Sequence, residues 1–169
     1  MSDGGITDNL GIRSLYDRVE LMGGARNATN DIKHRPKYIV INIVNAATRP
    51  DNPMDSSSDI PSSVQVVGAV SATQIDRYTV ESLPLLEEAF TEWATELSTP
   101  TQPVIPYFIK LDFESIDNKK QRKFFNNMAT SFSLPNDQVD KLIEAGHKLL
   151  RQSPEFQKLL ETIREEDKT

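Results

Sequence analysis

The run Tyr38–Val44 constrains the fold of this chain more than any other segment. Its residues are Tyr-Ile-Val-Ile-Asn-Ile-Val, a mostly β-branched sequence that hardly alternates between apolar and polar positions. Such a run is typical of a strand that is buried on both faces of a helix-covered sheet. The run therefore predicts an α/β fold, and a strand of this kind needs neighbouring strands along both of its edges.

Apolar residues at helical spacing predict helices before and after this strand. Residues 10–22 form a short amphipathic pattern that Asn9 is expected to cap and Gly23-Gly24 to end. Ser82 is expected to open a longer amphipathic helix with Pro84 in its first turn. The last third of the sequence is expected to be helical, with helices that start after Asp117, at Asn136 or Asp137, and at Ser153-Pro154.

Three segments between these helices have other patterns. Ala46–Ser63 is rich in Pro, Asp and Ser, which predicts a long loop. Val64–Ala72 is compatible with a strand and with the start of a helix, and periodicity does not decide between them. In Val104–Phe113, apolar residues alternate with residues that are mostly polar, which predicts a half-buried edge strand.

Charge and the scarcity of particular residue types exclude several classes of function. The chain has 19 Lys plus Arg against 25 Asp plus Glu, so its net charge of −6 argues against a nucleic-acid partner. It has no cysteine, which excludes a thiol nucleophile and a thiolate metal site. The only histidines, His34 and His147, are far apart and are expected on the surface, so no metal or cofactor is predicted. No apolar stretch is long enough to cross a bilayer, and the sequence indicates no localisation.

Two charged segments, Glu87–Glu96 and Lys119–Lys123, are expected to be solvated helix faces. Gly23-Gly24-Ala25-Arg26 lacks the glycine spacing and the Lys-Ser/Thr ending of a phosphate-binding loop, so it is expected to be a plain helix end.

The string Asp3-Gly4-Gly5-Ile6-Thr7-Asp8-Asn9-Leu10-Gly11-Ile12-Arg13 is the most specific motif. Taken alone, Asp-Gly-Gly is a common turn. The extended string resembles the Asp-Gly-Gly block of the patatin-like phospholipases, in which two glycines, an Asp-Asn pair and a helix follow an Asp. Further landmarks of that family are present in the same order. They are an apolar strand ending in Val44-Asn45-Ala46, a polar loop, a long amphipathic helix, and a late strand that contains Tyr107-Phe108-Ile109.

The resemblance implies a lipid acyl hydrolase with a three-layer α/β/α fold and a Ser-Asp dyad. In this family the Asp is the base that takes the proton of the serine nucleophile, and Asp3 matches that position. Gly4 and Gly5 would form the turn that aims Asp3, and Asn9 would support the loop by capping the first helix. A lipid or acyl ester is the implied substrate, with peripheral membrane contact, and the loop Ala46–Ser63 would border the lipid-entry side as a flap.

The sequence departs from the family at the nucleophile. No Gly-x-Ser-x-Gly elbow is present, and the closest string, residues 68–72, lacks its spacing and follows Asp3 instead of preceding it. We therefore expect residues 1–169 to be a partial patatin-like domain without its nucleophile half, with residues 115–169 as a helical C-terminal extension. Alone, such a piece is expected to be inactive, to expose apolar surface and to self-associate.

Two other readings of the sequence stay open. The chain could be a non-catalytic interaction protein that docks through an exposed apolar sheet edge. It could also be an unrelated carboxylate enzyme, which would need a second catalytic group near Asp3, and Asp8 is the local candidate.

Overall fold

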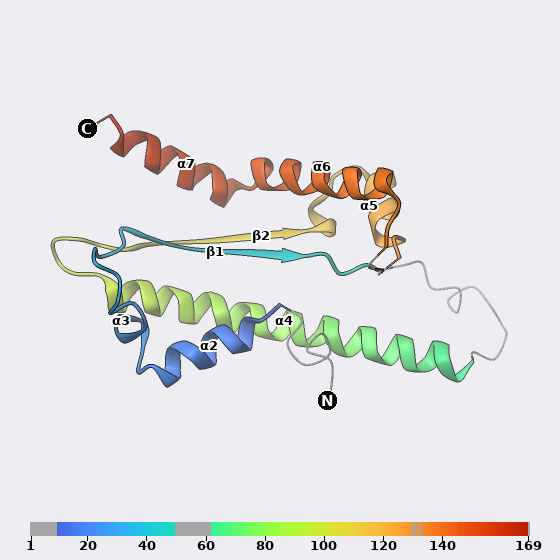
Figure 1. The fold of residues 1–169 in the computed structure, drawn as a ribbon, viewed down its shortest axis with the longest axis horizontal. Helices are drawn as coiled ribbons and strands as arrows, with labels where there is room; N and C mark the ends of the chain where they lie inside the picture. The colour runs from blue at the N-terminus through green and yellow to red at the C-terminus, as the bar shows by residue number, and fades with distance from the viewer. Residues whose placement is uncertain (1–9, 50–61, 130, 132, 169) are drawn as a thin grey trace. The chain divides into compact units, whose positions relative to one another are not determined.

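The computed structural model describes residues 10–49, 62–129, 131 and 133–168. It is a mixed α/β structure with two parallel strands, β1 and β2 (Figure 1). The described residues form two compact units, one of residues 10–40 and 62–107 and the other of residues 41–49 and 108–168. The elements in chain order are α2 (Ile12–Leu21), α3 (Ala25–Ala28), β1 (Tyr38–Asn45), α4 (Ser63–Leu97), β2 (Ile105–Asp112), η2 (Phe113–Ser115), α5 (Lys119–Asn126), α6 (Asn136–Gln152) and α7 (Pro154–Glu166).

The strands β1 and β2 pair with each other and are joined through α4. Parallel strands cannot be joined by a tight turn, so a crossover connection such as a helix is required. The amide N–H of Ile105 donates to the carbonyl of Lys37 at 3.0 Å, which sets the starts of the two strands side by side. The α/β class predicted from Tyr38–Val44 is therefore confirmed.

The prediction that β1 is buried on both faces is wrong. Ile43 is buried, whereas Val40 and Val44 are 46% and 61% exposed. Successive side chains of a strand point to opposite faces, so Val40, Asn42 and Val44 share one face, and all three are exposed. β2 is the single neighbour of β1 in the described part of the chain, and the apolar run reflects strand propensity more than burial.

The half-buried strand predicted over Val104–Phe113 is confirmed as β2. Tyr107, Ile109 and Leu111 are buried and alternate with the half-buried Phe108 and the exposed Lys110. An alternating pattern requires one covered face only, and for that reason it predicted burial correctly where the continuous run did not.

Helix α4 begins at Ser63, nineteen residues before the expected start at Ser82. Pro84 therefore lies in the interior of the helix and not in its first turn. The open choice for Val64–Ala72 is therefore settled as helix. Proline has no N–H to donate to the carbonyl of the residue four positions earlier, here Val80. Val80 and Pro84 are both exposed, so contact with water reduces the cost of that unpaired carbonyl.

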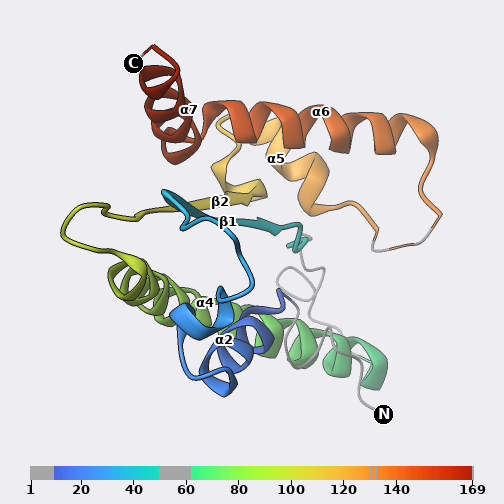
Figure 2. The ribbon, with the colours of Figure 1, turned by 60° about the vertical axis from the view of Figure 1, so that its left-hand side comes forward.

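In the first unit, α2 and α3 lie against α4, as Figure 2 shows for α2. The ring of Tyr16 on α2 stacks on Trp93 of α4 with centroids 6.3 Å apart, and Phe90 meets Trp93 edge-on at 6.4 Å. Phe90 and Trp93 are buried by this packing, whereas Tyr16 covers them from the surface and is 40% exposed. Its buried apolar residues are Ile12, Val19, Ala25, Leu86, Ala89, Phe90, Trp93, Ala94, Leu97, Val104 and Tyr107.

In the second unit, a small core forms where η2 and α5 meet α6. Phe113 and Phe125 stack with centroids 5.2 Å apart, and Ile116 completes the buried cluster. Phe124, next to the buried Phe125 on α5, is 37% exposed. Partly buried residues that pack against the cluster are Met128, Leu142, Ala145 and Leu149.

The helix starts agree with the sequence in part. Ser153 accepts from the N–H of Phe156 and Pro154 is in the first turn of α7, as predicted. The cap of α5 is Asn118 and not Asp117, because the side chain of Asn118 accepts from two backbone N–H groups. Asp and Asn are both good N-caps, so the sequence alone did not separate these neighbours. The N-cap position of α2 is occupied by Gly11, and the predicted cap Asn9 lies outside the described residues.

Replacing Pro84 by alanine should stabilise the first unit by about 1–3 kcal/mol, because it restores the backbone hydrogen bond to Val80 and removes the ring clash. The measurement is urea unfolding followed by the fluorescence of Trp93, the single tryptophan of the chain. Pro103→Ala is the matched control, since Pro103 is exposed and lies outside any helix. Equal effects of the two substitutions would mean that Pro84 does not destabilise α4.

Candidate functional site

The residues predicted to form the catalytic site, Asp3, Gly4, Gly5 and Asn9, lie outside the described residues. Their geometry is therefore not tested. The part of the motif that is described is its end, where Gly11 adopts φ 66° and Ile12 starts α2. A left-handed φ strains any residue with a side chain, so glycine is favoured at the point where the chain enters the helix.

The Gly23-Gly24 pair ends α2, as predicted. Gly23 has φ 79°, and its N–H donates to the carbonyl of Glu20 at 2.9 Å. The N–H of Gly24 donates to the carbonyl of Val19 at 3.0 Å. These bonds satisfy carbonyls of the last turn and reverse the chain into α3.

Glu96 connects this turn to the end of α4. Its carboxylate accepts from the backbone N–H of Ala25 at 2.9 Å and from that of Arg26 at 3.1 Å. The guanidinium of Arg26 donates in return to the carbonyl of Glu96 at 2.6 Å. Gly24 has φ 101°, and a Cβ there would lie 2.8 Å from a carboxylate oxygen of Glu96, so glycine is favoured beside this contact.

The expectation that the whole Glu87–Glu96 face is solvated is therefore wrong at one position. Glu87, Glu88 and Glu92 are exposed, whereas Glu96 is half-buried and caps the N-terminus of α3. The negative charge also lies at the positive end of the short helix. Helical periodicity could not identify this role, because the donors are about seventy residues earlier in the sequence.

The second unit has a cavity of about 350 Å³ between α5 and α6. Ile116, Phe125, Ala145 and Leu149 form apolar parts of its lining. Lys120 of α5 and Lys148 of α6 line the same cavity, together with Phe124, Asp117, Gln121, Lys141, Glu144 and Gln152.

A second cavity, of about 670 Å³, shares Lys120 and Phe124 with the first. Above the ring of Phe124, the ammonium of Lys141 is 4.8 Å from the ring centroid and also contacts Asp137 at 3.3 Å. The Lys119–Lys123 run was expected to be solvated, and four of its five residues are exposed. The remaining residue, Arg122, is half-buried, and its guanidinium donates to the carbonyl of Glu114 at 3.1 Å.

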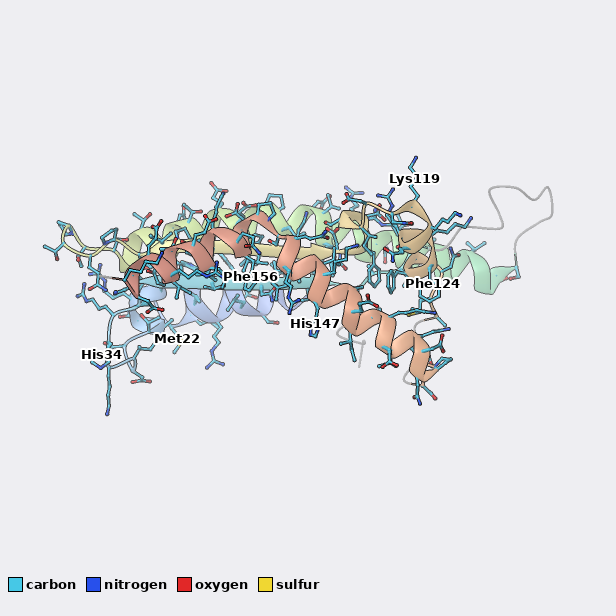
Figure 3. The ribbon with its side chains drawn as sticks, turned by 90° about the horizontal axis from the view of Figure 1, so that it is seen from above. Met22, His34, Lys119, Phe124, His147 and Phe156 are labelled. Atoms are coloured by element: carbon cyan, nitrogen blue, oxygen red, sulfur yellow. The ribbon has the colours of Figure 1, made fainter. Side chains whose placement is uncertain are left out.

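His34 and His147 are both exposed, as predicted (Figure 3). Among the described residues, no three His, Asp or Glu side chains gather closely enough to hold a metal ion. Within the same residues, none of the helices has both the length and the apolarity to cross a membrane.

Comparisons with known proteins give no match: no family model, no curated protein and no solved structure matches the chain.

Replacing Glu96 by alanine should destabilise the first unit by about 1–2 kcal/mol, because the N–H groups of Ala25 and Arg26 lose their acceptor. Urea unfolding monitored through Trp93 measures the change. Glu92→Ala, an exposed glutamate one turn earlier on α4, is the matched control and should change stability by less than about 0.5 kcal/mol. If both variants unfold at the same urea concentration, Glu96 does not connect α3 to α4 in solution.

Proposed function

We propose that this chain is the Asp-bearing part of a patatin-like lipid acyl hydrolase with a three-layer α/β/α fold and a helical C-terminal extension over residues 115–169. The observation that carries the proposal is the string from Asp3 to Arg13 and the helix α2 that follows it directly. The substrate class is an acyl ester of a lipid, reached by peripheral contact with a membrane or micelle.

In the proposed reaction Asp3 acts as the general base. A serine hydroxyl is a weak nucleophile until a carboxylate within hydrogen-bond distance takes its proton. The serine oxygen then attacks the ester carbonyl, the alcohol leaves with the proton, and water releases the fatty acid in a second step. This dyad needs no histidine, which agrees with the exposure of His34 and His147.

The arrangement around β1 supports the proposal. The strand is followed by Asn45, whose side-chain oxygen accepts from the N–H of Ala47 at 3.1 Å, so the chain turns at the carboxyl end of the strand. Ligands of open α/β sheets bind outside the carboxyl ends of parallel strands. The segment 46–62 therefore starts where a flap over a lipid site would start, and residues 50–61 of it lie outside the described part.

The proposed hydrolase requires a serine elbow and an oxyanion loop, and the 169 residues contain no Gly-x-Ser-x-Gly. Nucleophile, base and oxyanion donors act together in acyl transfer. We therefore propose that this chain supplies the base and has no hydrolase activity by itself.

The alternative function is a non-catalytic interaction protein that docks through an exposed apolar sheet edge. Among the described residues β1 pairs with β2 alone, and its Val40 and Val44 are exposed, which favours this alternative. The other alternative, a carboxylate enzyme that uses Asp3 and Asp8, rests on residues outside the described part.

The coding sequence that precedes the codon of Met1 tests the proposed hydrolase. We expect an in-frame Gly-x-Ser-x-Gly with a glycine-rich loop before it. In the polypeptide encoded by that frame, Asp3→Asn should lower kcat on fatty-acyl esters by about 10²–10⁴-fold, because the general base is lost. Asp8→Asn is the matched control and should keep most of the activity. An Asp3→Asn protein that hydrolyses esters as fast as the unmodified protein would refute the dyad.

The self-association expected from exposed apolar surface is tested by sedimentation velocity. The unmodified chain should form oligomers, and Val44→Lys should shift the distribution toward monomer, because a lysine on an exposed strand opposes edge pairing. Val80→Lys is the control, since Val80 is 59% exposed on α4. A monomeric unmodified chain with cooperative unfolding would argue against both self-association and docking through β1.

A further inference from the structure

The two cavities beside Phe124 concentrate positive charge on a chain that is acidic overall. Lys120, Lys141 and Lys148 line the first cavity with the carboxylates Asp117 and Glu144. The second cavity adds Lys123, and its lining has no Asp or Glu. Four ammonium groups and two carboxylates line the two cavities, and Asp137 pairs with Lys141, so the local charge is +1, whereas the net charge of the chain is −6.

Two of these lysines have no anionic partner in the described part of the chain. Lys141 contacts Asp137 at 3.3 Å and the ring of Phe124. For Lys120 and Lys148, by contrast, no described carboxylate oxygen lies within 4.0 Å of the ammonium group. One comes from α5 and the other from α6, so they approach the same cavity from different helices.

Between these lysines the lining is apolar. Ile116 and Phe125 are buried in the small core, and Ala145 and Leu149 of α6 pack against it. Phe124 is 37% exposed and is shared by the two cavities. Figure 3 shows Lys119 pointing away from the side of α5 that carries Phe124, and Lys119 lines neither cavity. The lysines that α5 contributes to the lining therefore lie on the side of α5 that carries Phe124.

We propose that this groove between α5 and α6, lined by Lys120, Phe124, Phe125, Lys148 and Leu149, binds the free carboxylate of a single fatty-acyl chain. The acyl chain lies on the apolar residues beside Phe124, and the carboxylate lies between the ammonium groups of Lys120 and Lys148. Pockets of small molecules are mostly apolar with a few convergent polar groups, and the combination found here is that of an anionic amphiphile.

The dimensions favour a single chain over a peptide helix. Helix α5 has eight residues and is therefore about 12 Å long. A stable protein–protein interface usually buries more than about 1,000 Å², which a groove of this length does not provide. A volume of about 350 Å³ is at the lower end of the range for small-molecule pockets. All residues of the groove belong to the second unit, so binding there is independent of the Ser-Asp dyad.

Isothermal titration of the full chain with dodecanoate, below its micelle concentration and at neutral pH, tests the proposal. We expect saturable binding that weakens as salt is added. Lys120→Gln/Lys148→Gln should weaken binding by about tenfold, since each exposed ion pair contributes a few-fold to affinity. Phe124→Ala should weaken it too, through lost apolar contact. Lys119→Gln/Lys168→Gln removes the same charge from exposed positions outside both cavities and should bind normally.

Three outcomes would overturn the proposal. The first is equal binding by the two double variants, and the second is equally tight binding of the cationic dodecyltrimethylammonium, because either would mean that Lys120 and Lys148 do not select an anion. The third is binding to anionic phospholipid vesicles without binding to monomeric dodecanoate, which would make the lysines a membrane-contact surface. Asp3→Asn should leave dodecanoate affinity unchanged, so failure of the dyad and failure of this site are distinguishable.

Discussion

The parallel pairing of β1 and β2 is the constraint on which the rest of the structure depends. Two parallel strands must be joined by a crossover, and here the connection contains the 35-residue helix α4. The C-terminal half of that helix then becomes the surface on which α2 and α3 pack, through Trp93 and through the carboxylate of Glu96. The strand β2, which follows α4, leads directly into η2, and η2 contributes Phe113 to the core of the second unit.

Local patterns in the sequence were sufficient where one interaction decides the structure. The alternation through Tyr107, Ile109 and Leu111 predicted β2, and Ser153 with Pro154 predicted the start of α7, since both depend on neighbouring residues only. The continuous run of β1 and the proline of α4 were misjudged for a different reason. Segments far away in the sequence decide whether Val44 is covered and whether the carbonyl of Val80, which Pro84 leaves unpaired, reaches water.

The same limit applies to the candidate sites. The role of Glu96 could not be predicted, because its donors belong to Ala25 and Arg26, and no spacing rule connects residues so far apart. Likewise, the lysine run of α5 gave no sign of a groove until Lys148 of α6 was found to line the same cavity as Lys120. The Asp-Gly-Gly string is the opposite case, because its information is local and its residues Asp3, Gly4 and Gly5 lie outside the described part.

The proposed function therefore depends on the chemistry of Asp3, and the most direct measurement is the rate at which a fluorophosphonate modifies the polypeptide that carries both Asp3 and a Gly-x-Ser-x-Gly elbow. We expect mass spectrometry to find a single modified serine, within that elbow, and Asp3→Asn to slow its modification by orders of magnitude. Modification at an unchanged rate in the Asp3→Asn protein, or no modified serine at all, would contradict it.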